Sequence, residues 1–478
     1  MPAVFRALLA RIMSLTQQPS AHKALPAARI ILPFVDTGPL QDVMLALLLT
    51  PVWWWLGVEQ FIWPVLFGIA AVKVLYLQHW RLRITQPVRW FALFLVAVLI
   101  SGLFVEDTAR QLTFVRNLGA FAAGFLALLV ITNRARSWEW IDKLLNVVLF
   151  VMLLAGIAGL LAAAGAWRPA IHSLIGQLLP GSVAATSYGQ VISVRVLGQL
   201  SWFSGLGIYY RLNSFFLFSN HFSSALIYVI PFFFLRLSQA RGVKKLLPGL
   251  SILLLLFNLI LTTGRVATLS LLVGALYFSL FHSLYRRTIR GLVAFILTLA
   301  VLLLLFTTVL EMTSVSGSGG VLGQTSEVIE QFTFARGEGS FTNRSGVYEA
   351  TLAGFRQRPL FGWGTERDVE GLNIPAGSHS EYLAALYRQG LLGFVAIIGL
   401  MISVWLATRP PGGTPARSPA GAFLRYGRWF FVASLINSIM TDPSVDSTTY
   451  VLLWVLLALL ISTAQLIRRP GEYAFPDS

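Results

Sequence analysis

Residues 246–283 read LLPGLSILLLLFNLILTTGRVATLSLLVGALYFSLFHS, two long apolar runs that meet at a single arginine, Arg265. Runs of this composition are typical of helices that cross a membrane, because about 20 apolar residues span the hydrocarbon core. Lys244 and Lys245 precede the first run, and basic residues also follow the second. The stretch therefore predicts two membrane helices joined by a turn that carries Arg265.

The whole chain has the composition of a membrane protein. Of its 478 residues, 56% are hydrophobic and only 12% are charged, with a mean hydropathy of +0.73, whereas an average soluble domain has about 25% charged residues. An ordinary soluble enzyme is excluded. We predict an all-α, polytopic integral membrane protein with about 12 transmembrane helices. The predicted spans are 40–57, 58–77, 90–105, 115–132, 144–164, 219–235, 246–262, 266–283, 291–310, 380–408, 429–440 and 449–467.

The net charge of +16 indicates orientation in the membrane, and no nucleic-acid partner is expected. With a cytoplasmic N-terminus, 23 of the 36 lysines and arginines fall in inside segments, 12 fall outside, and Lys73 lies within a span. Short cytoplasmic loops of membrane proteins carry an excess of basic residues. The distribution therefore predicts that both termini are cytoplasmic.

We predict one membrane domain with two short extensions. Residues 1–39 form a cytoplasmic or interfacial N-terminal segment, because MPAVFRALLARIMSL lacks a signal-peptide core and a convincing cleavage site. Residues 40–467 form a single transmembrane domain, and residues 468–478 form a cytoplasmic tail. The proline- and glycine-rich stretch RPPGGTPARSP at 409–419 predicts a flexible cytoplasmic linker.

Two outside segments, at about 165–218 and 311–379, break the hydrophobic pattern. The first is predicted to include a re-entrant or interfacial helix. The second is a long loop between spans nine and ten, and nine of the 20 acidic residues lie between Glu311 and Glu381. Within it, SGVYEATLAGFRQ predicts a helix with Val347, Leu352 and Phe355 available for one buried side. Polar chemistry is thus concentrated on the external face.

Outside arginines at span ends are the first candidates for a binding site. A guanidinium near hydrocarbon is costly unless it pairs with a carboxylate, a carbonyl or an anionic ligand, and its planar fork suits phosphate. Arg265 is the sharpest case, since Gly264 would let another group approach closely. Interfacial snorkelling or a structural ion pair is the alternative, which the residues alone leave open. The five arginines are Arg211, Arg265, Arg356, Arg358 and Arg388.

Three histidines, His172, His221 and His379, fall outside under this topology. Their spacing does not suit a metal site and the chain has no cysteine, so no metal and no cofactor are expected. His379 stands in GSHSEYL just before an apolar run, where Ser378 or Ser380 could cap a helix. A histidine there is more often structural, yet a neutral imidazole can accept a proton from a hydroxyl.

Several motifs together resemble the O-antigen ligase and O-antigen polymerase superfamily. The main stretch is FRQRPLFGWG at 355–364, followed after a short gap by HSEYLAALYRQGLLGF at 379–394. Two earlier segments, RLNSFFLFSNHFSSALI at 211–227 and TTGRVATLSLLVG at 262–274, also resemble that family. The matches follow the family order from Arg211 to Phe394.

This resemblance implies a metal-independent, inverting glycosyltransferase in the bacterial inner membrane, with a periplasmic active site. The donor would be a glycan on undecaprenyl diphosphate. In the ligase, which we favour, the acceptor is a sugar hydroxyl of lipid A-core and the product is lipopolysaccharide. In the polymerase, the acceptor is another lipid-linked repeat. By position, Arg211 and Arg265 would bind the diphosphate, and His379 would orient or deprotonate the acceptor hydroxyl.

Other residues of these motifs are weaker candidates. Arg388 and either Arg356 or Arg358 would contact phosphate or core sugars, and Asn220 and His221 would line the site, although Asn220 could equally cap a helix. A transporter or flippase is the alternative from another class, but the predicted spans are almost free of ionisable residues. The acidic residues that remain possible bases are Glu349, Glu366 and Glu381.

Overall fold

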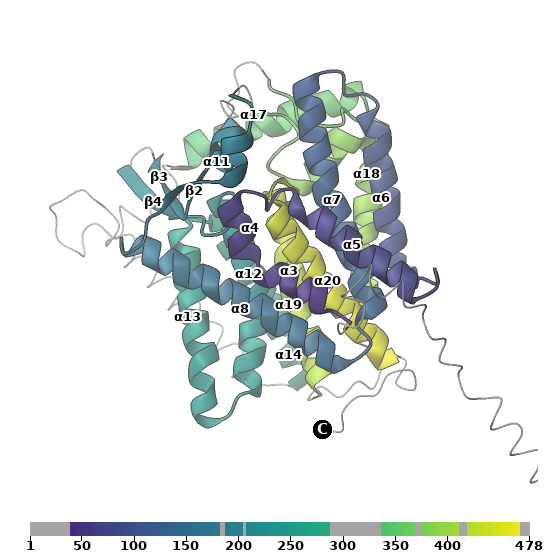
Figure 1. Cartoon of the computed structure of the whole chain (residues 1–478), viewed down its shortest axis with the longest axis vertical. Helices are drawn as coiled ribbons and strands as arrows, with labels where there is room; N and C mark the ends of the chain where they lie inside the picture. Colours follow the sequence, from purple (N-terminus) through teal and green to yellow (C-terminus); the bar gives the residue numbers. More distant parts are fainter. Residues whose placement is uncertain are drawn as a thin grey trace, which may run out of the picture. The chain divides into compact units, whose positions relative to one another are not determined.

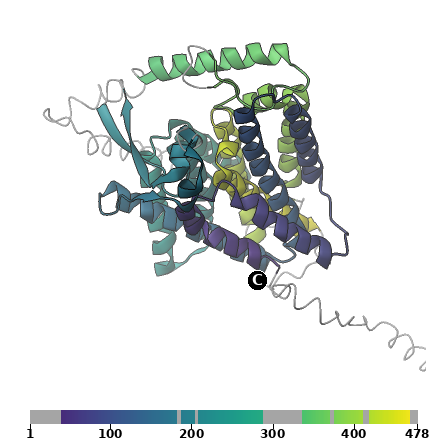
Figure 2. The ribbon, with the colours of Figure 1, turned by 45° about the horizontal axis from the view of Figure 1, so that its top comes forward.

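The computed structural model describes residues 39–181, 187–203, 207–286, 336–369, 375–410 and 418–468, all of which belong to one compact unit. Figures 1 and 2 show its helices packed side by side, with short strands and helix α17 (Arg336–Gln357) near one end. The predictions for residues 1–38, the span at 291–310, the SVSGSGG stretch and the tail beyond Arg468 lie outside the described residues.

Among the described residues, six helical segments are long and apolar enough to cross a membrane. Because they are separate along the chain, this part of the protein is a multi-pass membrane protein. The segments lie in α7 (Thr108–Arg134), α8 (Trp138–Ala163), α12 (Ser219–Gln239), η1 with α13 (Gly242–Lys245 and Leu246–Leu261), α18 (Glu381–Ala407) and α20 (Ser447–Arg468). Further helices are α5 (Ile62–Leu77), α6 (Gln86–Gly102), α14 (Arg265–Arg286) and α19 (Pro419–Ser438).

The predicted first span, 40–57, forms two short helices, α3 (Gln41–Leu48) and α4 (Thr50–Leu56). Pro51 lies in the first turn of α4 and has no N–H to continue the hydrogen bonding of α3, so the helix breaks there. At 1.5 Å per residue, eight residues reach only about 12 Å. Each other predicted span within the described residues coincides with a helix, and the total of about 12 stays a prediction.

The outside segment at 165–218 contains strands as well as helix, so the fold is mostly rather than purely helical. Strand β1 (Ala170–His172) pairs antiparallel with β2 (Val194–Val196), and β3 (Gly198–Phe203) pairs antiparallel with β4 (Gly207–Leu212). Runs such as VRV and IYY favour strands because β-branched and aromatic side chains suit a pleated surface. Its helices in the described part are the short α9 (Leu174–Leu178) and α11 (Ser187–Ser193).

Helix α20 lies at the centre of the packing. It contacts α7, α8, α12 and α19, and 89% of its apolar window is buried. The Trp454 ring lies 4.4 Å from that of Phe91, and the Tyr450 ring lies 5.7 Å from that of Phe121. A helix that is apolar on every side is suited to such a place.

Helix α18 is interrupted at Gly390, where φ is +65°. Past this break, the Leu391 N–H donates to the Pro359 carbonyl at 2.8 Å rather than to a carbonyl of its own helix. A Cβ at Gly390 would collide with the backbone of Leu360. Only glycine combines this dihedral angle with so close an approach.

The loop at 358–364, with sequence RPLFGWG, docks against the same interruption. The Trp363 N–H donates to the Tyr387 carbonyl at 3.0 Å, and the Gly364 N–H donates to the Arg388 carbonyl at 2.7 Å. The first half of α18 ends here, so these two carbonyls have no partner within the helix. The N–H groups of the loop take the place of the missing helical donors. The loop and the helix form one unit.

We expect Gly390→Ala to lower the thermal unfolding midpoint of the purified protein in detergent. An alanine there would adopt a left-handed conformation that costs about 1–2 kcal/mol, and its Cβ would displace the Leu360 backbone. Gly68→Ala in α5 is the matched control, because nothing lies within 4 Å of its added Cβ. Equal midpoints for the two variants would contradict this account of the break.

Candidate functional site

Arg388 stands at the centre of a buried cluster of charges. Its side chain is 2% exposed, with Nε 3.3 Å from an oxygen of Glu366 and Nη1 2.9 Å from an oxygen of Asp442. Arg388 comes from α18, Glu366 from the loop after the GWG turn, and Asp442 precedes the 3-10 helix η3 (Pro443–Val445). Three distant parts of the chain therefore meet at one guanidinium.

Glu366 is also held from α7. Arg116 Nη2 lies 3.2 Å from one carboxylate oxygen, and Asn117 Nδ2 donates to the other at 3.4 Å. Burial alone would raise the pKa of Glu366, but the charges of Arg388 and Arg116 outweigh it, and the pKa lies below its ordinary value. Glu366 is therefore an ionised structural partner and a poor candidate for a base.

His221 joins the cluster at the start of α12. It is 2% exposed, and its Nε2 lies 3.3 Å from the backbone carbonyl oxygen of Asp442. The Asp442 carboxylate in turn accepts from the N–H and the hydroxyl of Ser444, at 3.1 and 2.6 Å. His221 thus lies among the buried charges, where it helps to fix the segment before α20.

Arg211 and Arg265 are brought together by the turn between α13 and α14. Arg211 Nε, from β4, donates to the Thr262 carbonyl at 3.3 Å, and Arg265 begins α14 three residues later. The close approach predicted at Gly264 is confirmed, since a Cβ there would lie 2.6 Å from Ser223 of α12. The turn that leads into Arg265, to which Arg211 is bonded, therefore packs on the first turns of α12, near His221 in sequence.

His379 immediately precedes α18 and has a left-handed backbone, with φ of +61°. The predicted cap is Ser380, whose hydroxyl accepts from the Leu383 N–H at 3.3 Å. Two residues before His379, the Gly377 N–H donates to the Thr351 hydroxyl of α17 at 2.8 Å. The backbone on both sides of His379 is thus fixed, and such conformations of a non-glycine residue are often found at functional sites.

The start of α18 and the turn with Arg265 are connected through α19 and α12. The Tyr382 hydroxyl, in the first turn of α18, donates to the Leu435 carbonyl of α19 at 3.3 Å. Asn437 of α19 donates to the Ser224 hydroxyl of α12 at 2.8 Å. The start of α18, next to His379, is therefore linked through α19 and α12 to the turn that carries Arg265. That they share one substrate cavity with Arg211 stays a prediction.

The remaining predicted arginines occupy different environments. Arg356 is exposed in the last turn of α17. The Arg358 guanidinium lies 4.1 Å from the centre of the Trp363 ring and 5.8 Å from that of Phe104, so it packs the 358–364 loop. The helix predicted for SGVYEATLAGFRQ is confirmed and forms part of α17. Val347 is buried there, but Leu352 is 40% exposed.

Asn220 lies in the first turn of α12 and does not cap it. The N-cap residue is Phe218, and no side chain caps this helix. The Asn220 carbonyl instead accepts from the hydroxyls of Ser223 and Ser224, each at 2.8 Å. The observed contacts of Asn220 therefore stabilise the serine-rich turn on which the Arg265 turn packs.

Sequence reasoning missed a second buried ion pair at the same end. Both oxygens of Glu59 lie 2.6 Å from Nη2 of Arg195, and the two side chains are 0% and 2% exposed. Burial raises the pKa of Glu59 to about 7, although the charge of Arg195 acts in the opposite direction. Neighbouring Gln60 donates to Asp446 at 2.9 Å. TDPSVDS at 441–447, two aspartates between apolar runs, signals the Asp446 partner of Gln60 but not the Glu59–Arg195 pair itself.

The described residues offer cations for an anion but no evident metal site. In this part of the chain, no three histidine, aspartate or glutamate side chains are grouped as a metal ion would need. Arginine binds phosphate through parallel N–H donors. The turn that carries Arg265, with Arg211 of β4 bonded to it, therefore suits a phosphate-bearing ligand.

These features define a multi-pass helical membrane protein with clustered arginines and a helix-start histidine at one end of its spans. Residues 250–398 match the family model described as O-Antigen ligase. This match confirms the predicted resemblance to the O-antigen ligase superfamily over this part of the chain. Arg265, His379 and Arg388 lie inside the matched region, whereas Arg211, Asn220 and His221 precede it. No curated protein gives a significant match to the chain.

We expect Arg388→Met to destabilise the protein by about 3–5 kcal/mol, because removal of one partner leaves buried carboxylates uncompensated. The affected carboxylates belong to Glu366 and Asp442. Arg356→Met is the control, since Arg356 is exposed. Unfolding midpoints in detergent measure the effect, and a midpoint for Arg388→Met as high as that of the control would refute the role of the cluster.

Glu366 should contribute to stability in a pH-dependent way. Because its folded pKa lies below the ordinary 4.5, its contribution is complete above pH 4.5 and is lost as the pH falls through the folded pKa. The difference in midpoint between wild type and Glu366→Gln should therefore be largest near neutral pH and shrink below pH 4.5. The exposed Glu349 provides the control Glu349→Gln. A difference that grows on acidification would have the wrong sign.

Proposed function

We propose that this protein transfers a glycan from undecaprenyl diphosphate to a sugar hydroxyl of lipid A-core, as an O-antigen ligase of the bacterial inner membrane. The family match gives the enzyme class, a ligase- or polymerase-type membrane enzyme. The observation that supports the proposal is the placement of the Arg265 turn on α12 and of the start of α18, next to His379, on α19, two helices that are hydrogen-bonded to each other. That placement can bring a cation for the leaving group and a base for the acceptor to one substrate.

The proposed reaction is a single displacement with inversion. The acceptor hydroxyl oxygen attacks the anomeric carbon while the bond from that carbon to the diphosphate oxygen breaks. The hydroxyl proton passes to His379, and undecaprenyl diphosphate leaves with the electron pair. Arg211 and Arg265 stabilise the negative charge that develops on the leaving group, through charge-assisted hydrogen bonds.

The electrostatics favour His379 over Glu366 as the base. A general base is most effective when its pKa is close to the working pH, and imidazole side chains ordinarily titrate near neutrality. Glu366 has a lowered pKa and is held between Arg116 and Arg388. Its removal would disturb the buried cluster rather than remove a base.

The charge distribution supports a periplasmic site. Helix α13 separates Lys244 and Lys245 of η1 from the turn with Arg265, so these basic residues lie at the opposite end of the helix from the proposed site. Basic loops face the cytoplasm in membrane proteins. The arginine turn and His379 are then on the outer side, where lipid-linked glycans would be joined to lipid A-core.

The test uses purified protein in liposomes with a radiolabelled undecaprenyl-diphosphate glycan and EDTA. Transfer that occurs only when lipid A-core is supplied would support the ligase. A ladder of longer glycans from the donor alone would instead indicate the polymerase, and no transfer to either acceptor would contradict both proposals.

The proposed base has a matched control. We expect His379→Ala to slow transfer by about 10²–10⁴-fold, the range typical of general base catalysis, and Arg265→Ala to abolish detectable transfer. His172→Ala should retain activity, because His172 is exposed on β1 and is not among the residues proposed for catalysis. Wild-type rates for His379→Ala in folded protein would remove His379 from the mechanism.

A further inference from the structure

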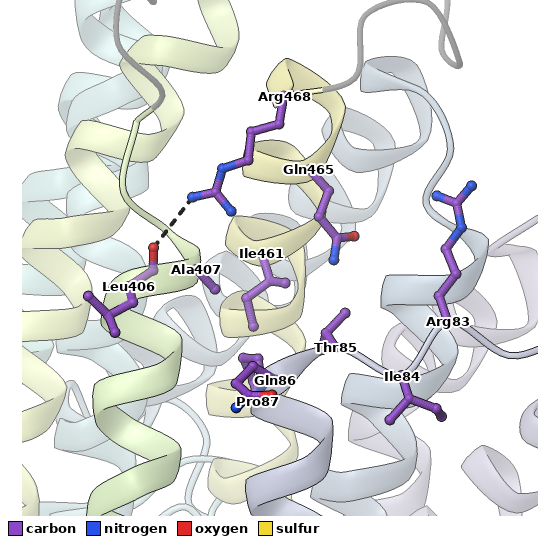
Figure 3. A pocket seen from close by; sticks show the side chains of 10 residues that line it. All are labelled: Arg83, Ile84, Thr85, Gln86, Pro87, Leu406, Ala407, Ile461, Gln465 and Arg468. Carbon is purple, nitrogen blue, oxygen red and sulfur yellow. Dashed lines mark hydrogen bonds between the residues drawn. The ribbon is translucent and has the colours of Figure 1, made fainter.

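A separate pocket lies at the opposite end of α18, between the end of that helix, the start of α6 and the end of α20 (Figure 3). Its volume is about 540 Å³. None of the residues proposed for glycan transfer lines it. The chemistry of the lining residues therefore indicates which ligand the pocket can bind.

The polar side of the pocket is formed by Arg83, Gln465 and Arg468. Arg468 Nη2 donates to the Leu406 carbonyl at 3.4 Å and to the Arg409 carbonyl at 3.2 Å, which holds it across the gap between α20 and α18 (Figure 3). Because both carbonyls are neutral, these hydrogen bonds do not compensate the positive charge of Arg468. The guanidinium therefore favours an anion in the pocket.

Arg83 is placed by its backbone. Its N–H donates to the Asn133 side chain at 2.7 Å, and its carbonyl accepts from the same amide at 3.2 Å. Gln78 donates to the Asn133 carbonyl at 3.0 Å, so both ends of this short segment are tied to the end of α7. The fold thus holds two arginines, from distant parts of the chain, around one pocket.

The other side of the pocket is apolar. Ile84, Leu406 and Ile461 line it, and Ile84 and Leu406 remain 45% and 48% exposed. The pocket lies where the apolar spans α18 and α20 end, which is the depth of a lipid head group. A site with cations on one wall and exposed aliphatic side chains on the other suits an amphiphilic anion better than a soluble one.

We propose that this pocket binds the phosphate head group of an anionic membrane phospholipid, with the acyl chains over Leu406 and Ile84. Basic pockets between membrane helices are a recurring way of binding such head groups. The site holds a membrane lipid that is not consumed in glycan transfer. The inference does not depend on the proposed function.

The experiment measures lipid retention by native mass spectrometry on the full-length protein in detergent, titrated with phosphatidylglycerol or phosphatidylcholine. We expect phosphatidylglycerol to be retained preferentially. Arg83→Gln and Arg468→Gln should each weaken its binding about fivefold, and the double variant about thirtyfold, the effect typical of one and two basic residues at a membrane surface. Inorganic phosphate at the same concentration should not compete.

Two further variants make the test specific. Arg81→Gln is the matched control, because Arg81 is exposed in the same segment but does not line the pocket. Gln465→Glu keeps the size of the side chain and adds a negative charge, so it should also weaken binding. Unchanged binding in the double variant, an equal loss in Arg81→Gln, equal retention of phosphatidylcholine, or displacement by inorganic phosphate would overturn the proposal.

Discussion

The burial of the Arg388 guanidinium is the constraint on which the end of the protein around the start of α18 depends. A buried charge is tolerated only with well-placed opposite charges, and here Glu366 and Asp442 supply them. Glu366 is linked to α7 through Arg116, and Asp442 is linked to α12 through His221. One arginine on α18 thereby fixes four separate segments around the proposed site.

The residues of the family motif divide into two groups by their physical roles. Gly390, Gly362 and Gly364 have positive φ angles, and a Cβ on any of them would collide with neighbouring atoms, so they permit the loop to dock on α18. Arg265 and His379 lie at helix starts, where their positions follow from caps and turns. The first group fixes the geometry, and the second group offers the chemistry. A motif match alone does not separate these roles.

The sequence predicted those structural features that depend on residues close to one another along the chain. Apolar runs located most described helices, and local patterns located the Ser380 cap and the close approach at Gly264. It did not predict the strands at 170–212, because short β-rich runs within a polar segment have no strong periodicity. It also missed the pairing of Glu59 with Arg195, which lie 136 positions apart. Such pairs depend on which helices become neighbours, and hydropathy contains little of that information.

Helix α18 physically connects the two ends of the molecule. At its start, Ser380 caps it and Tyr382 contacts α19. In its middle, the 358–364 loop is hydrogen-bonded to the break at Gly390, and at its end the Leu406 carbonyl accepts from Arg468 of α20. Because the helix is held at three points, a displacement at one of them strains the hydrogen bonds at the other two. The start of α18 next to His379 therefore belongs to a helix that is also held at the Gly390 break and by Arg468.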